Sequence, residues 1–230
     1  MKTSSLRKLC AQRGDTSLLD VMAILAAVAV VTLLVLPMIA KSRATSTINC
    51  VNILKQTGLG FLVWAMDHGG KYPMQVSTNM GGTMELVPGG AVFPHYAVMS
   101  NELSTPKILL CPKDTRASGL KAATNFARLS DSSISYFVGL DAATNLSQMW
   151  LCGDRNLAAN NNPIKPGLFV FKASKLLSWT AEMHNTRGNF CFADGSVQDV
   201  PNAGLQRSAT NALRSYYQAT TNTSFRLAIP

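Results

Sequence analysis

The chain has 230 residues, of which 47% are hydrophobic and 14% charged, and this composition excludes an intrinsically disordered protein. Its formal net charge is +9, and setting aside the four cations of the first thirteen residues leaves 17 of the 21 basic residues against 12 acidic ones. The remaining cations are scattered and no aromatic platform motif accompanies them, so no nucleic acid is expected as a partner.

An uncharged apolar run extends from Val21 to Ala40. As a helix it would be about 30 Å long, which matches the hydrocarbon core of a bilayer. Residues 1–15 are basic and should stay in the cytoplasm, which places the rest of the chain outside. A cleaved secretory signal is the alternative, but its apolar core usually has about 7 to 15 residues. We therefore predict a transmembrane helix over residues 16–40.

One carboxylate, Asp20, lies just inside this apolar segment. Intramembrane acids normally pair or mark a function, because a lone charge in lipid costs a few kcal/mol. Asp20 therefore either has a partner or sits at headgroup level and faces water. Pro37 should kink the helix, because its ring removes a hydrogen bond and clashes with the preceding turn.

Helical periodicity continues beyond the membrane, which predicts an amphipathic stalk helix over residues 41–70. Gly69 and Gly70 should end it, giving one helix of about fifty residues. Trp64, Tyr72 and the apolar stripe should pack on a sheet. The stripe consists of Ile48, Val51, Leu54, Gly58, Phe61 or Leu62, and Ala65.

Residues 71–230 contain short apolar runs between turn residues, which is typical of a sheet-rich domain. Two Gly-rich stretches, residues 79–90 and 157–167, are expected to be loops. A short amphipathic helix follows from Leu205 to Tyr216, and the final residues SFRLAIP are expected as an edge strand. The predicted strands are 107–111, 134–140, 149–153 and 167–171.

The stretch GNFCFADGSVQDV, residues 188–200, predicts a β-hairpin. Asp194 and Gly195 would supply the two positive-φ residues of a type I′ turn between the strands. Asp194 is then explained by its turn, where a short acidic side chain bonds local backbone.

The basic tail, Gly14, the acid that follows it and the apolar helix that continues into a stalk resemble type IV prepilins and the pseudopilins of type II secretion. In that family a membrane peptidase cuts after a glycine and the new amino terminus is methylated. The family has an acid at mature position five and a proline seventeen residues later, as Asp20 and Pro37 are spaced here. The resemblance therefore implies that Asp20 pairs with the amino terminus of a neighbouring copy.

The cleavage region departs from the family pattern. Counting back from Asp20 puts mature position one at Thr16 and the preceding residue at Asp15, with Gly14 one place too early. Either cleavage follows Gly14, or Asp15 replaces the glycine, or the leader is retained.

The remainder of the chain resembles pseudopilin-like proteins of planctomycetes and verrucomicrobia. The marks are the stalk end CVNILKQTGLGFLVWAMDHGGKYP, the stretch LLCPKDT, and His184 followed after nine residues by Asp194 and Gly195. The resemblance implies an α+β, pilin-like fold in which a long N-terminal transmembrane and stalk helix packs on a mainly antiparallel β-sheet domain. It also implies a single-pass protein of the inner (cytoplasmic) membrane with residues 71–230 in the periplasm.

Catalytic and metal sites are not predicted. His184, Asp154, Asp194 and Cys191 are the candidates, but no hydrolase, zincin or phosphate-binding motif surrounds them, and His184 is expected to anchor a loop through its ring. The scattered acids after Asp141 give no calcium loop of the kind that major pseudopilins hold, so no cofactor is predicted, and calcium is left open as an alternative.

The cysteines, at positions 10, 50, 111, 152 and 191, contain no C-x-x-C pair, which argues against a zinc ribbon. The last four either form disulfides outside the cell or serve as small buried apolar residues.

The sequence thus predicts a non-enzymatic structural subunit of a secretion or pilus-like fibre. Its expected partners are homo- or hetero-pseudopilin subunits, the prepilin peptidase, the inner-membrane secretion platform and membrane lipid. Two alternatives are an anchored extracytoplasmic binding protein that does not polymerise, and a membrane-tethered hydrolase that uses His184 with Asp154 or Asp194.

Overall fold

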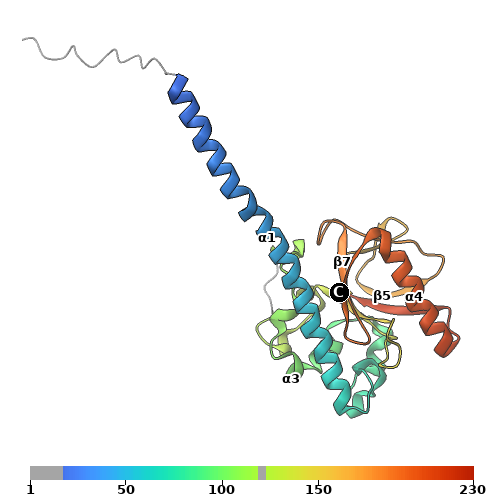
Figure 1. The fold of residues 1–230 in the computed structure, drawn as a ribbon. Helices are drawn as coiled ribbons and strands as arrows, with labels where there is room; N and C mark the ends of the chain where they lie inside the picture. The colour runs from blue at the N-terminus through green and yellow to red at the C-terminus, as the bar shows by residue number, and fades with distance from the viewer. Residues whose placement is uncertain (1–17, 119–122) are drawn as a thin grey trace, which may run out of the picture. The chain divides into compact units, whose positions relative to one another are not determined.

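The computed structural model describes residues 18–118 and 123–230, apart from the side chains of residues 36–48, 117 and 118. Contacts divide the chain into two compact units, with the boundary between Thr45 and Ser46. Helix α1 crosses this boundary (Figure 1). The α-helices are α1 (Leu18–Asp67), α2 (Phe93–Ala97), α3 (Ser100–Leu103) and α4 (Asn202–Thr220).

The second unit is built on a six-stranded sheet in the order β5-β9-β1-β2-β7-β8, in which every neighbouring pair is antiparallel. A smaller antiparallel sheet has the order β4-β3-β6. The fold is therefore α+β with an N-terminal apolar helix. The strands are β1 (Tyr136–Gly139), β2 (Trp150–Asp154), β3 (Leu157–Ala159), β4 (Asn162–Pro163), β5 (Gly167–Lys172), β6 (Leu177–Trp179), β7 (Arg187–Phe192), β8 (Val197–Pro201) and β9 (Ser224–Ile229).

Seven short 3₁₀ helices, η1 to η7, account for much of the chain between α1 and β1. They are η1 (Pro73–Gln75), η2 (Thr78–Met80), η3 (Met84–Gly89), η4 (Pro106–Leu109), η5 (Thr115–Ser118), η6 (Phe126–Arg128) and η7 (Asp131–Ser133).

The second half of α1 packs on the sheet through the predicted stripe. Leu54, Gly58, Phe61 and Ala65 are buried, whereas Val51 is only half-buried. A Cβ on Gly58 would lie 2.2 Å from the Cys191 Sγ of β7, so a glycine is required for this close approach.

Helix α4 covers the other face of the sheet. Side chains alternate along β7, so Phe190 faces away from the side on which Cys191 meets α1. Phe190 stacks on Trp150, and the Trp150 indole N–H donates to the Ser208 hydroxyl of α4 at 3.0 Å. The second unit thus has three layers, helix, sheet and helix, in Figure 1.

Tyr72 and Trp64 are both buried, as expected. The Tyr72 hydroxyl donates to the Ala193 carbonyl at 2.6 Å, next to the β7–β8 turn, and its ring contacts Phe61 edge-on.

Two predictions about extended segments were wrong. Residues 107–109 belong to 3₁₀ helix η4 instead of a strand, because Pro106 at its first position fixes φ and the Thr105 side chain caps the Lys107 N–H. The expected loop 157–167 contains the hairpin β3–β4, whose turn residues Asn160 and Asn161 both have positive φ.

The β7–β8 hairpin exists, but its turn is not type I′. Only Gly195 has positive φ, and the Gly195 N–H donates to the Phe192 carbonyl at 2.9 Å, which makes a three-residue turn with glycine in the left-handed position. Strand β9 is also not an edge strand, because it pairs with both β1 and β5.

Candidate functional site

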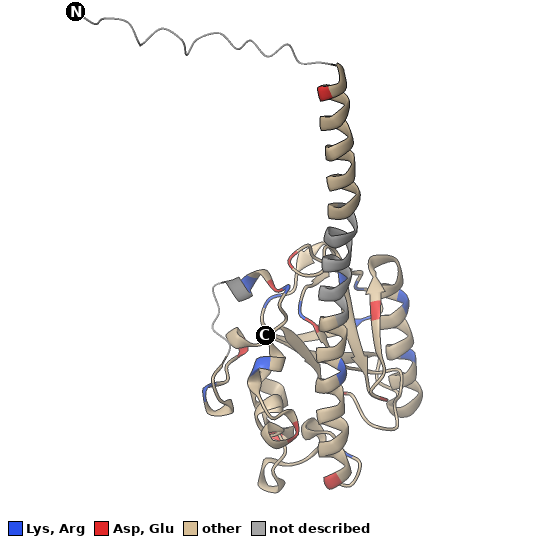
Figure 2. Ribbon diagram, turned by 60° about the vertical axis from the view of Figure 1, so that its left-hand side comes forward, with Lys and Arg blue, Asp and Glu red and all other residues tan. Residues whose placement is uncertain are grey.

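The first half of α1 is an apolar surface. Leu18–Val35 is long and apolar enough to cross a membrane, and every residue in it is exposed. Asp20 in the first turn is its only charged residue, and Figure 2 shows no Lys, Arg, Asp or Glu from there to the undescribed side chains. At 1.5 Å per residue the stretch is about 27 Å long.

The polar side chain in the middle of this stretch bonds within the helix. The Thr32 hydroxyl reaches the Val28 and Ala29 carbonyls, each at 2.9 Å. This arrangement suits an apolar surrounding, in which every polar group needs an internal partner. The helical backbone continues through Pro37, whose side chain lies outside the described ones, and the cleavage region Gly14, Asp15 and Thr16 also lies outside the described residues.

His184 lies in the loop between β6 and β7 and points into the second unit. It is followed by Asn185 and Thr186, and all three have positive φ between 49° and 64°. The His184 side chain is 5% exposed, and its Nε2 lies 3.4 Å from both the Cys111 Sγ and the Asp154 Oδ2.

Asp154 ends β2 and is completely buried. Its Oδ2 accepts from the backbone and side-chain amides of Asn189 at 2.7 and 2.8 Å, while its Oδ1 has no hydrogen-bond partner among the described residues. Burial raises the pKa of Asp154 to about 6, although His184 and Asn189 favour its charged form. Burial alone would lower the pKa of His184, but Cys111 and Asp154 raise it.

Cys50 of α1 brings a second thiol to this place. Its Sγ lies 3.2 Å from the Cys111 Sγ, and both residues are fully buried. The hydrogen bond lowers the pKa of Cys50 and, together with burial, raises that of Cys111. The sequence marked Cys111 and His184 as parts of separate motifs, but the spacing gave no sign that they meet.

The other predicted residues lie apart from this cluster. Asp194 is in the β7–β8 turn, where its Oδ1 accepts from the Ser196 N–H at 2.9 Å. His184 precedes β7 and Asp194 follows it. The six residues of that strand, about 20 Å, therefore separate the two side chains. Cys191 faces Gly58.

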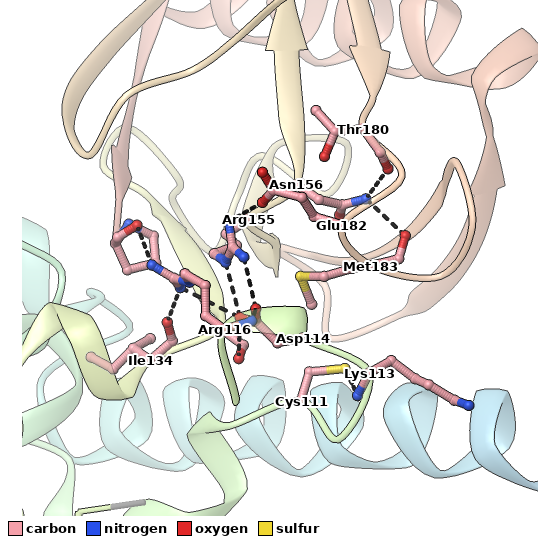
Figure 3. Close-up of polar contacts among 12 residues, drawn as sticks. Cys111, Lys113, Asp114, Arg116, Ile134, Arg155, Asn156, Thr180, Glu182 and Met183 are labelled. Atoms are coloured by element: carbon pink, nitrogen blue, oxygen red, sulfur yellow. Dashed lines mark hydrogen bonds and ion pairs between the residues drawn. The ribbon is translucent and has the colours of Figure 1, made fainter. Parts of the chain in front are cut away.

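An ion-pair network around the buried Asp114 lies next to Cys111 (Figure 3). Asp114 accepts from the Arg155 guanidinium at 2.7 and 2.9 Å and from the Ser135 hydroxyl at 2.8 Å. Burial would raise the pKa of Asp114, but these donors lower it to about 2. Arg155 also reaches Glu182 at 2.6 Å, and Arg116 donates to the Ile134 carbonyl at 2.8 Å. The network fixes the LLCPKDT segment and so positions Cys111.

Two surface cavities lie elsewhere. One, of about 430 Å³, lies between β8 and α4 and is lined by Asp199 and Arg207 among others. The other, of about 400 Å³, is lined by Arg116, Arg155 and Pro230 among others. Neither is lined by His184 or Asp154, so the described cavities give no support to the hydrolase alternative.

Comparison of the chain with protein-family models, with curated proteins and with solved structures found no match.

Proposed function

We propose that the chain is a pseudopilin-like structural subunit that assembles into a type II secretion or type IV pilus-like fibre and performs no catalysis. The observation that carries this proposal is the exposed apolar half of α1 with a single carboxylate in its first turn. An apolar helix surface that the described part of the chain leaves exposed requires lipid or other helices around it.

Small residues make close helix packing favourable beside the carboxylate. At 100° per residue, Asp20, Ala23 and Ala27 lie on one stripe of α1. Small side chains let two backbones approach closely in lipid, where packing rather than the hydrophobic effect drives association. The stripe thus allows a neighbouring helix to come near Asp20.

In the proposed fibre, the Asp20 carboxylate of one copy pairs with the amino terminus of the next. The pair compensates both charges in a medium where an isolated charge costs about 2.5 to 3.5 kcal/mol, and it fixes the axial register of the helices. The prepilin peptidase creates that amino terminus near Gly14 to Thr16. The chain crosses the inner membrane once, with residues 71–230 in the periplasm.

Cross-linking in native envelopes tests the proposal. A photo-crosslinking amino acid at Leu25 of the full chain should give a ladder at multiples of the subunit mass. Asp20→Ala should abolish the ladder and Asp20→Glu should preserve it, because only the first removes the charge. Asp67→Ala, the same change at the exposed far end of α1, is the matched control and should leave the ladder intact.

If no cross-linked species larger than the monomer forms, the result would instead fit the anchored binding protein that does not polymerise. If Asp20→Ala leaves the ladder unchanged, the result would contradict the role proposed for the carboxylate.

A further inference from the structure

Four metal-ligating side chains converge inside the second unit from four separate segments. Cys50 comes from α1, Cys111 from the LLCPKDT segment, Asp154 from the end of β2 and His184 from the β6–β7 loop. The two sulfurs and a ring nitrogen of His184 all lie within 4.8 Å of one another, and Asp154 Oδ2 lies 3.4 Å from His184 Nε2. We propose that Cys50, Cys111 and His184, with Asp154 beside them, form a structural site for Zn²⁺ or a chemically similar divalent ion.

The separations are close to those of ligands on one tetrahedral zinc ion. With Zn–S near 2.3 Å and Zn–N or Zn–O near 2.0 Å, tetrahedral angles give about 3.8 Å between two sulfurs, about 3.6 Å between sulfur and nitrogen, and about 3.3 Å between nitrogen and oxygen. The corresponding distances are 3.2, 3.4 and 3.4 Å. Opening the Cys50–Cys111 pair by about half an ångström would therefore admit the ion.

Buried polar atoms without a partner independently point to a ligand at this place. Asp154 is fully buried with one carboxylate oxygen unpartnered among the described residues, and the same holds for the hydroxyl of Tyr136, its cross-strand neighbour on β1. Buried polar groups are nearly always satisfied, and buried charges are paired or bind metals. A divalent ion would hold both sulfurs as thiolates and offset two of the three negative charges that they and the Asp154 carboxylate then carry.

The surroundings hold the ligands in place. The Lys113 backbone N–H donates to Cys111 Sγ at 3.4 Å, as the dashed line in Figure 3 shows, and Asn189 fixes the Asp154 carboxylate with two donors. Such outer contacts orient metal ligands. Three consecutive non-glycine residues in the left-handed region, starting at His184, hold the imidazole there, and strained backbone of this kind clusters at functional sites.

A disulfide between Cys50 and Cys111 explains less of this arrangement. It would bring the two sulfurs to about 2.05 Å from each other. The free carboxylate oxygen of the buried Asp154 would then still have no partner. The ion instead takes Cys50, Cys111 and His184 as its ligands, with Asp154 as the nearest further oxygen donor, and at this buried place it ties α1 to the sheet.

Cobalt substitution tests the site in the full-length chain. The protein is purified in mild detergent, reduced, freed of metal and titrated anaerobically with Co²⁺. We expect equimolar binding, with thiolate-to-Co²⁺ charge-transfer absorption and the intense visible bands of tetrahedral Co²⁺, both displaced by Zn²⁺. Cys50→Ser, Cys111→Ser and His184→Gln should each lose this spectrum. Cys152→Ser, which removes a buried thiol outside the cluster, should keep it.

A second measurement separates ligand loss from misfolding. Zn²⁺ should raise the melting temperature of the wild type, and the metal-free variants should melt like the metal-free wild type but not respond to Zn²⁺. The proposal is overturned if Co²⁺ gives no thiolate bands, or if His184→Gln retains them unchanged. It is equally overturned if protein from native envelopes contains a Cys50–Cys111 disulfide, seen as two free thiols instead of the four that the cysteines after the proposed cleavage region provide.

Discussion

The two halves of α1 differ in how much of their apolar surface the described part of the chain covers. From Leu18 to Val35 every residue is exposed, although all but Asp20 and Thr32 are apolar. From Asn49 to Asp67 the burial follows the helical period, with Leu54, Phe61 and Ala65 against the sheet. The described part of the chain thus covers the apolar face of one half of this helix and leaves the apolar surface of the other half exposed.

This difference shows that helical structure alone does not identify the surroundings of a segment. A helix that is apolar all round is suited to lipid or to a bundle, whereas an amphipathic one is suited to a single packed face. Substitutions placed in equivalent pairs in the two halves can therefore break or sharpen the comparison.

The largest effect is expected from Leu54→Ala, because this side chain is fully buried. Removing it should lower the free energy of unfolding of the second unit by about 2 to 5 kcal/mol. Leu34→Ala, at a residue that is 61% exposed, should change it by less than about 0.5 kcal/mol. Urea unfolding of the full chain in detergent can be followed by tryptophan fluorescence, because Trp64, Trp150 and Trp179 are all buried in that unit. Equal effects of the two substitutions would contradict the comparison.

A new charge should have its main effect in the exposed apolar half of α1, where it should weaken membrane insertion. Ala27→Arg places a guanidinium in the middle of the apolar stretch and should cost about 2.5 to 3.5 kcal/mol of membrane insertion. The measurement is the fraction of chain that resists carbonate extraction from membranes. Gln56→Arg, on the exposed face of the packed half, is the control and should leave that fraction unchanged. Full retention of Ala27→Arg would argue against a membrane-spanning role.

His95 should make a destabilising contribution to the packed unit in mild acid. Its Nδ1 lies 2.7 Å from the Thr83 hydroxyl, and burial lowers its pKa to about 4. The folded pKa lies below the unfolded value of about 6.5, so the unfolded chain binds the proton first and stability falls as pH decreases from about 6.5 towards 4. This one group should remove about 2 kcal/mol between pH 7 and pH 5.

The His95 effect can be isolated by comparison with His95→Gln, which should show a flatter stability profile over that pH range. Identical slopes for the two proteins in urea unfolding would rule out His95 as the cause.

A smaller effect is expected where α1 touches β7. Gly58→Ala places a methyl group against the Cys191 sulfur and should destabilise the second unit by about 1 to 2 kcal/mol, after the helix-propensity gain of alanine. Adding Cys191→Ala should recover part of the loss, because the two sites are in direct contact. Gly89→Ala, where a Cβ meets nothing within 4 Å, is the control. A double variant less stable than both single variants would show that the contact is not the cause.

Much of the fold could be predicted because local patterns and tertiary contacts agree. The fifty-residue helix followed from hydrophobic periodicity and Gly69, and β1, β2, β5, β7 and β8 followed from apolar runs. The prediction failed where turn chemistry decided the outcome. The consecutive positive-φ residues expected at Asp194 and Gly195 occur instead at Asn160 and Asn161, since asparagine also tolerates the left-handed region.

The cluster around His184 could not be predicted in the same way. Cys111 is 61 residues from Cys50 and 73 from His184, and only the packing of α1, the LLCPKDT segment and the β6–β7 loop on the sheet brings them together. Asp20, in contrast, stands out from the sequence alone because a charge in an apolar run is conspicuous wherever the chain folds.

The central claim is that the Asp20 carboxylate of one copy meets the amino terminus of the next. A zero-length carbodiimide reagent joins a carboxylate to an amine only where they touch, so it can be applied to envelopes that contain a mixture of ¹⁴N- and ¹⁵N-labelled chains. We predict a mixed-isotope peptide in which Asp20 is bonded to a new amino-terminal residue near Thr16. The absence of that peptide, with the leader still attached and Asp20 unmodified by any neighbour, would contradict the account.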